Sequence, residues 1–109
     1  MYKVCGTTIT MVRGDTFVAV INLSRGGESY IPSNNDIIRF AARRSGEVRP
    51  RITKIVPIDT LELCLSPEDT KDLPGGLYKY DLEIEFENGD IDTFISNGVL
   101  NIISDICRE

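Results

Sequence analysis

The sequence predicts an all-β domain: an immunoglobulin-like antiparallel β-sandwich of about seven or eight strands with one short helical turn. Short apolar segments separated by turn-forming residues run along the whole chain, and no strand alternates with a long helix. One segment, residues 78–87, alternates strictly in polarity. The chain has 109 residues, the length of one domain, so we expect a single domain over residues 1–109. A small barrel is the competing architecture.

The strongest single element is the segment of residues 78–87, in which even positions are apolar or aromatic and odd positions are charged. A period of two puts the two sets on opposite faces of a strand. Asn88-Gly89 follows and favours a two-residue type I′ turn into a return strand over residues 90–95. A slip of one residue would expose the apolar set. The turn predicts the pairs Phe86–Ile91, Ile84–Thr93 and Leu82–Ile95.

The other strands are shorter. They are predicted over residues 8–12, 16–23, 36–43, 51–56, 60–65 and 98–103. In the segment 36–43, the side chains of Ile38, Phe40 and Ala42 are expected to face inward. Residues 24–35, rich in Gly, Ser, Asn and Pro, predict a loop. The helical turn is expected at residues 66–69, where a capping serine precedes proline and two acids.

Three cysteines, Cys5, Cys64 and Cys107, are widely spaced, which is not typical of a disulfide framework or of a metal site. Cys64 lies in an apolar strand and is expected to be buried. The tripeptide Arg13-Gly14-Asp15 matches a known cell-adhesion sequence, but it is also a good turn between two strands, and we predict the turn.

Catalysis finds little support in this composition. Without histidine, Ser-His and Cys-His arrangements are impossible, and no glycine-rich segment has phosphate-loop spacing. Close carboxylates such as Glu83 and Glu85 are expected on an open strand face rather than in a cleft. We therefore predict no enzyme activity, no catalytic residues, no cofactor and no metal.

The charge is unevenly distributed along the chain. Residues 1–65 carry nine basic and six acidic side chains, a net +3, and residues 66–109 carry three basic and eleven acidic ones, a net −8. This balance disfavours nucleic-acid binding. No apolar run reaches the ~18 residues of a membrane span, and the N-terminus lacks the apolar core of an export signal, so we expect neither membrane insertion nor secretion.

Carboxylates gather on the outer side of the predicted hairpin, with Glu85 expected beside Asp92 and Glu87 beside Asp90. In an immunoglobulin-like order the strand of residues 36–43 would lie next to them with its own basic side chains outward. These charges could be solvated or paired internally, contact a neighbouring subunit or, as a further alternative, bind a cation such as calcium. The candidate protein-interaction residues are Arg39, Arg43, Asp81, Glu83, Glu85 and Asp92.

Several segments together resemble a known class of proteins. They are Val12-Arg13-Gly14-Asp15-Thr16-Phe17, residues 61–70 (LELCLSPEDT), residues 73–82 (LPGGLYKYDL), the Asn88-Gly89 hairpin and residues 98–102 (GVLNI). This pattern resembles small β-sandwich proteins of phages and prophages of Gram-positive bacteria, and is similar to the N-terminal immunoglobulin-like domain of phage baseplate upper proteins.

The resemblance implies a non-enzymatic structural or adaptor module of a phage or prophage tail or baseplate. Its expected partners are other virion proteins or copies of itself, including a homo-oligomer, and it would reside in the bacterial host cytoplasm during assembly and then in the virion. The alternative is a stand-alone binding module for a host-surface protein or carbohydrate. There is no tryptophan to stack on a sugar, and Tyr30 is the best exposed aromatic candidate.

Overall fold

The computed structural model describes residues 2–5, 7–25 and 28–104, and within them the protein is mostly β. These residues form ten strands and one helix. The elements are β1 (Tyr2–Cys5), β2 (Thr8–Val12), β3 (Phe17–Val20), β4 (Ser24–Arg25), β5 (Glu28–Ser29), β6 (Ile37–Arg44), β7 (Ile52–Val56), β8 (Glu62–Leu65), α1 (Pro67–Thr70), β9 (Gly76–Glu85) and β10 (Ile91–Ile103).

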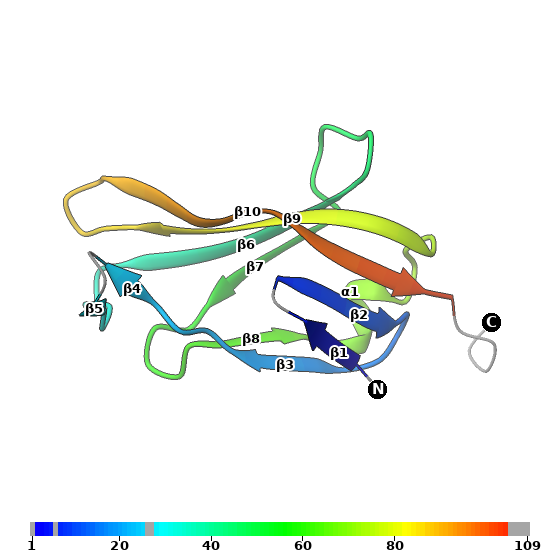
Figure 1. Ribbon diagram of the computed structural model, residues 1–109, viewed down its shortest axis with the longest axis horizontal. Coiled ribbons are helices and arrows are strands. Elements are labelled where there is room, and N and C mark those ends of the chain that lie inside the picture. The colour runs from blue at the N-terminus through cyan, green and yellow to red at the C-terminus, as the bar shows by residue number, and fades with distance from the viewer. Residues whose placement is uncertain (1, 6, 26–27, 105–109) are drawn as a thin grey trace.

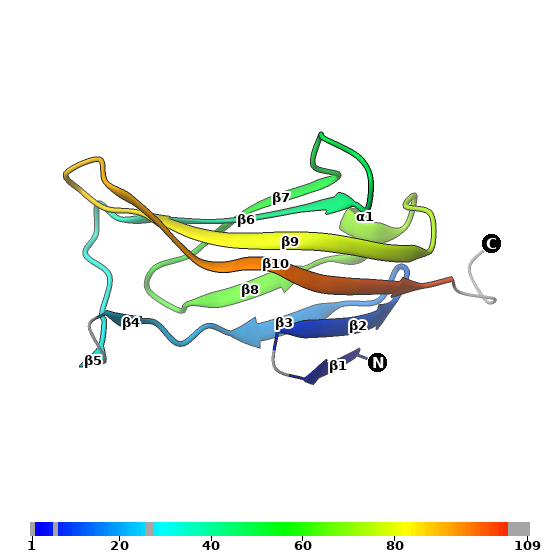
Figure 2. The same cartoon turned by 45° about the horizontal axis from the view of Figure 1, so that its top comes forward.

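Six of the described strands form one large sheet in the order β1-β2-β10-β9-β6-β7. A ribbon of β3 and β8 lies beneath one face of this sheet, and β4 and β5 form a small separate pair (Figures 1 and 2). All neighbours in the large sheet are antiparallel except β2 and β10, which are parallel. The prediction of a purely antiparallel arrangement is therefore wrong, because β2 runs in the same direction as β10, the last strand, and pairs with it.

The core lies between the ribbon and the large sheet, and β9 supplies its centre. Tyr78, Tyr80, Leu82 and Ile84 are at most 4% exposed, which confirms the predicted inward face of this strand. The predicted inward side chains of β6 are also confirmed, since Ile38, Phe40 and Ala42 are at most 1% exposed. Against them pack Phe17 of β3 and Leu63 and Leu65 of β8. Full burial of one such large side chain stabilises the fold by about 1.5–3 kcal/mol.

The turn after β9 differs from the predicted two-residue turn. The amide of Gly89 donates to the carbonyl of Phe86 (2.8 Å), and the amide of Phe86 donates to the carbonyl of Asp90 (2.7 Å). Gly89 has a φ of +94°, the left-handed conformation that closes a three-residue loop. The extra residue shifts the first pairs of the return strand by one position.

The pairing of β9 with β10 therefore differs from the prediction next to the turn and agrees with it farther along the strands. Ile91 pairs with Glu85 and Asp92 with Ile84, so the predicted pairs Phe86–Ile91 and Ile84–Thr93 do not form. A bulge between Thr93 and Ile95 inserts one residue, and the predicted pair Leu82–Ile95 does form. A second bulge precedes Gly98, and the two predicted strands 90–95 and 98–103 are one long strand, β10.

The remaining local predictions mostly agree with the structure. Strands lie within or close to the predicted segments 8–12, 16–23, 36–43, 51–56 and 60–65, and α1 begins after Ser66 as expected. The predicted loop 24–35 contains the short β4–β5 pair, and β1 was not predicted. Cys64 is exposed, so the prediction that it is buried is wrong: in β8 the side chains of Leu63 and Leu65 take the inward face. Cys107 lies outside the described residues.

Arg13-Gly14-Asp15 forms the predicted turn between β2 and β3. The amide of Asp15 donates to the carbonyl of Val12 (3.0 Å), and Gly14 has a φ of +84°. The amide of Gly14 donates to the hydroxyl of Thr70, which is fully buried (2.8 Å). The turn is thus fastened to the end of α1.

Gly98 allows β10 to approach the ring of Tyr80, its directly opposite neighbour. A Cβ atom at this position would lie 2.5 Å from the Cζ atom of Tyr80, whose hydroxyl donates to the carbonyl of Thr7 (2.6 Å). We expect Gly98→Ala to lower the free energy of unfolding by about 1–3 kcal/mol, because the ring cannot move without losing this bond. Urea unfolding measures this, with Ser96→Ala, an exposed position in the same strand, as the control. Equal stability of the two variants would contradict the close packing.

Candidate functional site

The face of the large sheet that points away from the β3–β8 ribbon is the candidate site, and we call it the outer face. It is formed by Arg39, Ala41 and Arg43 of β6, Lys79, Asp81, Glu83 and Glu85 of β9, Thr53 and Ile55 of β7, and Ile91 and Thr93 of β10. Within the described ranges, no strand or helix covers it (Figures 1 and 2). Its composition follows from the polarity of the odd positions in β9, which the buried even positions force outward.

An ion cluster centred on Arg39 occupies the middle of the outer face. Its guanidinium lies 3.3 Å from Oε2 of Glu83 and 2.8 Å from Oε1 of Glu85. β6 lies beside β9 with Arg39 opposite Glu83, which confirms the expectation that this strand supplies the basic partner of the carboxylates. The hydrogen bond that Arg39 donates to Glu85 is the main cause that raises the pKa of Arg39, so the guanidinium remains charged.

Three exposed isoleucines flank this cluster. Ile37 and Ile91 both lie opposite Glu85, one on each neighbouring strand, and Ile55 lies opposite Arg39. Their exposed fractions are 37%, 59% and 64%. Exposed apolar side chains around an arginine are a composition that protein interfaces favour over the rest of a protein surface. The exposure of Ile91 is a direct consequence of the register shift at the hairpin.

Farther along the same face, two cations lie side by side. Arg43 of β6 is directly opposite Lys79 of β9, and like charges in this position repel. Neither side chain has an acidic partner within 4.0 Å among the described residues. They line a hollow of about 240 Å³ together with Ala41, Ala42, Val48, Pro50, Asp81 and Asn97. An adjoining hollow of about 230 Å³ shares Ala41 and Asp81 with it, since the small side chain of Ala41 leaves the surface low at this point.

Asp81 has a structural role on the outer face, where it binds the backbone of β10. Its Oδ1 atom accepts a hydrogen bond from the amide of Asn97 (2.9 Å), a residue with a φ of +56° in the second bulge of β10. The carboxylate therefore holds the bulge in place and is turned toward β10 rather than toward Arg43.

Asp92 does not belong to the outer face. It is paired with Ile84, so it shares the opposite side of the sheet, and the expected neighbours Glu85 and Asp92 are not opposite one another. The other five candidate interaction residues do lie on one face. The cause of the difference is the three-residue hairpin loop, which moves Asp92 to the face that Thr93 was expected to occupy.

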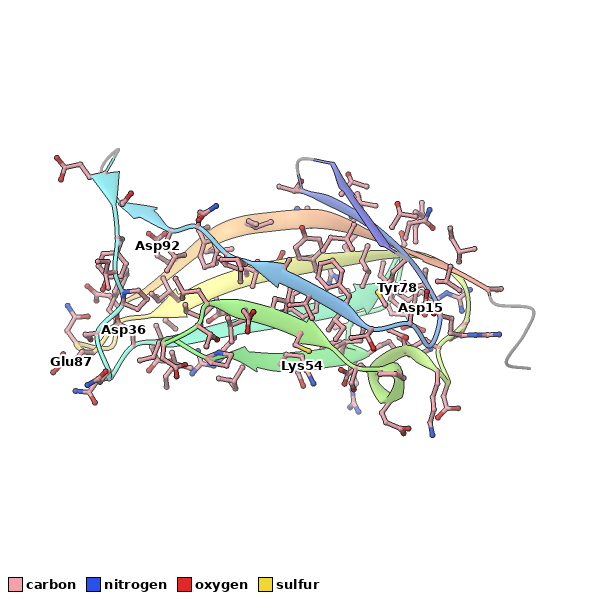
Figure 3. The ribbon with its side chains drawn as sticks, turned by 90° about the horizontal axis from the view of Figure 1, so that it is seen from below. Asp15, Asp36, Lys54, Tyr78, Glu87 and Asp92 are labelled. Carbon is pink, nitrogen blue, oxygen red and sulfur yellow. The ribbon has the colours of Figure 1, made fainter. Side chains whose placement is uncertain are left out.

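A second cluster, which the sequence did not predict, is centred on Asp36 beside the tip of the β9–β10 hairpin, where Figure 3 shows Asp36 close to Glu87. Asp36 is 5% exposed. Its carboxylate accepts four hydrogen bonds, from the hydroxyl of Tyr30 (2.6 Å), the amide and hydroxyl of Ser33 (3.0 and 3.1 Å) and the amide of Glu87 (3.1 Å). The loop before β6 is thereby attached to the hairpin. The only sequence signal was a serine three residues before an aspartate in a polar loop.

Tyr30 is part of this cluster and is half-buried. Its ring packs edge-on against Phe86, with ring centroids 5.7 Å apart, while its hydroxyl donates to Asp36. The aromatic residue expected to be the best exposed one for sugar stacking is therefore engaged within the fold.

An apolar hollow of about 360 Å³ lies on the opposite side of the large sheet, between β3 and β10. Phe17, Leu63, Leu82, Phe94 and Ile95 are among its lining residues, and none of the residues that line it is charged. It lacks the convergent polar groups that orient a small-molecule ligand. It continues the core at the place where the first bulge of β10 turns both Phe94 and Ile95 toward the ribbon.

The described part of the chain contains no group of three or more Cys, Asp or Glu side chains placed to hold a metal ion. None of its helices is long and apolar enough to cross a membrane.

Asp36 gives the stability of the protein a defined pH dependence. The hydrogen bond from Tyr30 is the largest cause that lowers the pKa of Asp36 below its ordinary 3.8; burial opposes it, and Ser33 and Glu87 add to it. A lowered pKa in the folded state stabilises the protein at pH values above the ordinary pKa, and this contribution is lost as the pH falls through the folded-state pKa.

We expect Asp36→Asn to lower the free energy of unfolding by about 2 kcal/mol at pH 7, because an amide can accept at only one of its two atoms while all four partners are donors. The difference from the unchanged protein should shrink between about pH 5 and pH 2. Urea unfolding across this range measures it, with the exposed Asp59→Asn as the control. A difference that stays constant with pH would show that Asp36 is not the titrating group.

No family model matches the chain. No curated protein matches it significantly.

Proposed function

We propose that the protein is a non-enzymatic structural or adaptor module that acts through protein–protein contacts made by its outer face. One observation carries this proposal: an uncovered sheet face on which exposed isoleucines flank a charged arginine cluster and two cations lack acidic partners among the described residues. A surface of this composition gains free energy when a partner covers the isoleucines and brings carboxylates to the cations.

The shape of the face favours a protein partner over a small molecule. Its two hollows measure about 240 and 230 Å³ and are open and partly charged. Sites for small molecules are usually concave, mostly apolar and about 300–1,000 Å³ in volume. A broad face with shallow hollows suits side chains projecting from another folded surface.

The particle to which the module belongs is proposed from the sequence pattern. The resemblance to phage and prophage proteins supports a place in a tail or baseplate, with other virion proteins or copies of the chain as partners. It also supports residence in the bacterial cytoplasm during assembly. We further propose that the fold is a variant of the immunoglobulin-like sandwich, supported by the apolar core between the β3–β8 ribbon and the large sheet.

A binding experiment with matched surface variants tests the proposal. Tagged protein is incubated with a lysate from prophage induction, and the retained proteins are identified by mass spectrometry. We expect the unchanged protein to retain one or more virion structural proteins and the double variant Ile55→Glu, Ile91→Glu to lose them. In the variant, charged glutamate side chains replace the apolar side chains that the partner is expected to cover.

The control is Val20→Glu, which changes a side chain on β3, away from the outer face, that is 64% exposed, as Ile55 is. This variant should retain the partner. Absence of virion proteins from the unchanged protein, or an equal loss in the Val20 variant, would contradict the proposed role of the outer face.

A further inference from the structure

The hollow beside Arg43 and Lys79 has a positively charged lining. Two opposed cations of the same sheet line it, and the only carboxylate in its lining, Asp81, already accepts the amide of Asn97. The surrounding hairpin adds positive charge: residues 43–51 contain four arginines and one glutamate, a net +3. That glutamate, Glu47, is occupied by Arg51, 2.7 Å away. A carboxylate brought from outside would relieve the repulsion between Arg43 and Lys79.

The tip of the β9–β10 hairpin is a source of such carboxylates. Glu87, Asp90 and Asp92 give residues 87–92 a net charge of −3, and all three are exposed. The tip is narrow and its backbone is fixed. Phe86 and Asp90 share a hydrogen bond, the Oδ1 atom of Asn88 accepts the amide of Asp90 (2.9 Å), and Asp36 accepts the amide of Glu87. A preorganised loop loses little conformational entropy when it binds.

The tip and the hollow lie toward opposite ends of the molecule. The protein measures 45 × 27 × 22 Å. Figure 3 shows Glu87 at one end of the long axis and Tyr78, the residue next to Lys79, toward the other. The hairpin therefore cannot reach the hollow of its own chain, whereas the hairpin of another copy can.

We infer that the acidic β9–β10 tip of one copy binds in the Arg43–Lys79 hollow of a second copy, which joins the chains head to tail. This inference rests on the proposed contact function of the outer face and names one partner for it. The tip segment of residues 87–92 has a net charge of −3, and the hairpin segment of residues 43–51 beside the hollow has a net charge of +3. A heterologous contact of this kind leaves one tip and one hollow unused in each pair, so it continues into a ring or an open chain.

Sedimentation velocity of the unchanged protein tests the contact. We expect species larger than the monomer at about 20 mM salt and dissociation toward the monomer at about 500 mM, because the Debye length falls from roughly 20 Å to roughly 4 Å. Neutral variants locate the contact. Arg43→Gln with Lys79→Gln removes both cations that line the hollow, and Glu87→Gln with Asp90→Asn lowers the net charge of the tip from −3 to −1; each pair should weaken association about tenfold or more.

Mixing the two neutral variants distinguishes this contact from general electrostatic attraction. Each variant alone should be monomeric, but the first retains a functional tip and the second a functional hollow. The mixture should therefore form a complex of one copy of each that grows no further. A variant with all four charges reversed, Arg43→Glu, Lys79→Glu, Glu87→Lys and Asp90→Lys, should associate again. All four positions are surface side chains, so circular dichroism should be unchanged in every variant.

A monomeric wild-type protein at low salt, or a mixture of the neutral variants that remains monomeric, would overturn the head-to-tail contact. Retention of a virion protein that depends on Ile55 and Ile91 would still support the proposed function in that case. If the protein neither self-associates nor retains a virion protein, both the inference and the proposed function are rejected. The two experiments therefore distinguish failure of the inference alone from failure of both.

Discussion

The alternation of side chains along β9 determines both the interior of this protein and the composition of its outer face. Tyr78, Tyr80, Leu82 and Ile84 fill the core between the large sheet and the β3–β8 ribbon, and their burial leaves the intervening side chains no position except the outer face. The same ten-residue strand thus stabilises the fold through its apolar side and presents Lys79, Asp81, Glu83 and Glu85 on the other. The charged face is a consequence of the core, because neither set can move without the other.

The outward side chains of β6 determine which charges of β9 are paired and which are not. Arg39 falls opposite Glu83 and pairs with two carboxylates, Ala41 leaves a hollow, and Arg43 falls opposite Lys79 and adds like charge. Pairs as exposed as those of Arg39 contribute little to stability. Their position among exposed isoleucines instead distinguishes, on one face, a zone of paired charges and apolar side chains from a zone of cations that lack acidic partners among the described residues. Complementary charge at the distant hairpin tip then gives the elongated molecule two unlike ends.

Much of this could be predicted from the sequence wherever a period of two was strong. The inward faces of β6 and β9 and the neighbourhood of Arg39 and Glu83 followed from polarity and strand order alone. The turn could not be predicted as well, because Asn-Gly is compatible both with a two-residue loop and with a three-residue loop that places only Gly89 in the left-handed conformation. That choice moved Asp92 off the candidate face and Ile91 onto it, and the first bulge of β10, which carries no clear sequence signal, restored the predicted register at Ile95.

Contacts between distant segments could not be predicted from the sequence either. The parallel pairing of β2 with β10 and the hydrogen bond from the amide of Glu87 to Asp36 join segments that lie far apart in the chain. The sequence shows Lys79 as the only basic residue among the odd positions of its strand. Its place in a pair of cations depends on Arg43 lying opposite, which the strand register determines. The burial expected for Cys64 failed because β8 turns its leucines inward instead.

Cross-strand nuclear Overhauser effects along β9 measure the placement of the outer face most directly. We expect contacts that pair Glu85 with Ile91 and with Ile37, Glu83 with Arg39, and Lys79 with Arg43. Contacts of Phe86 with Ile91 and of Ile84 with Thr93 would show the two-residue turn instead. Absence of contact between Lys79 and Arg43 would remove the paired cations on which the proposed assembly depends.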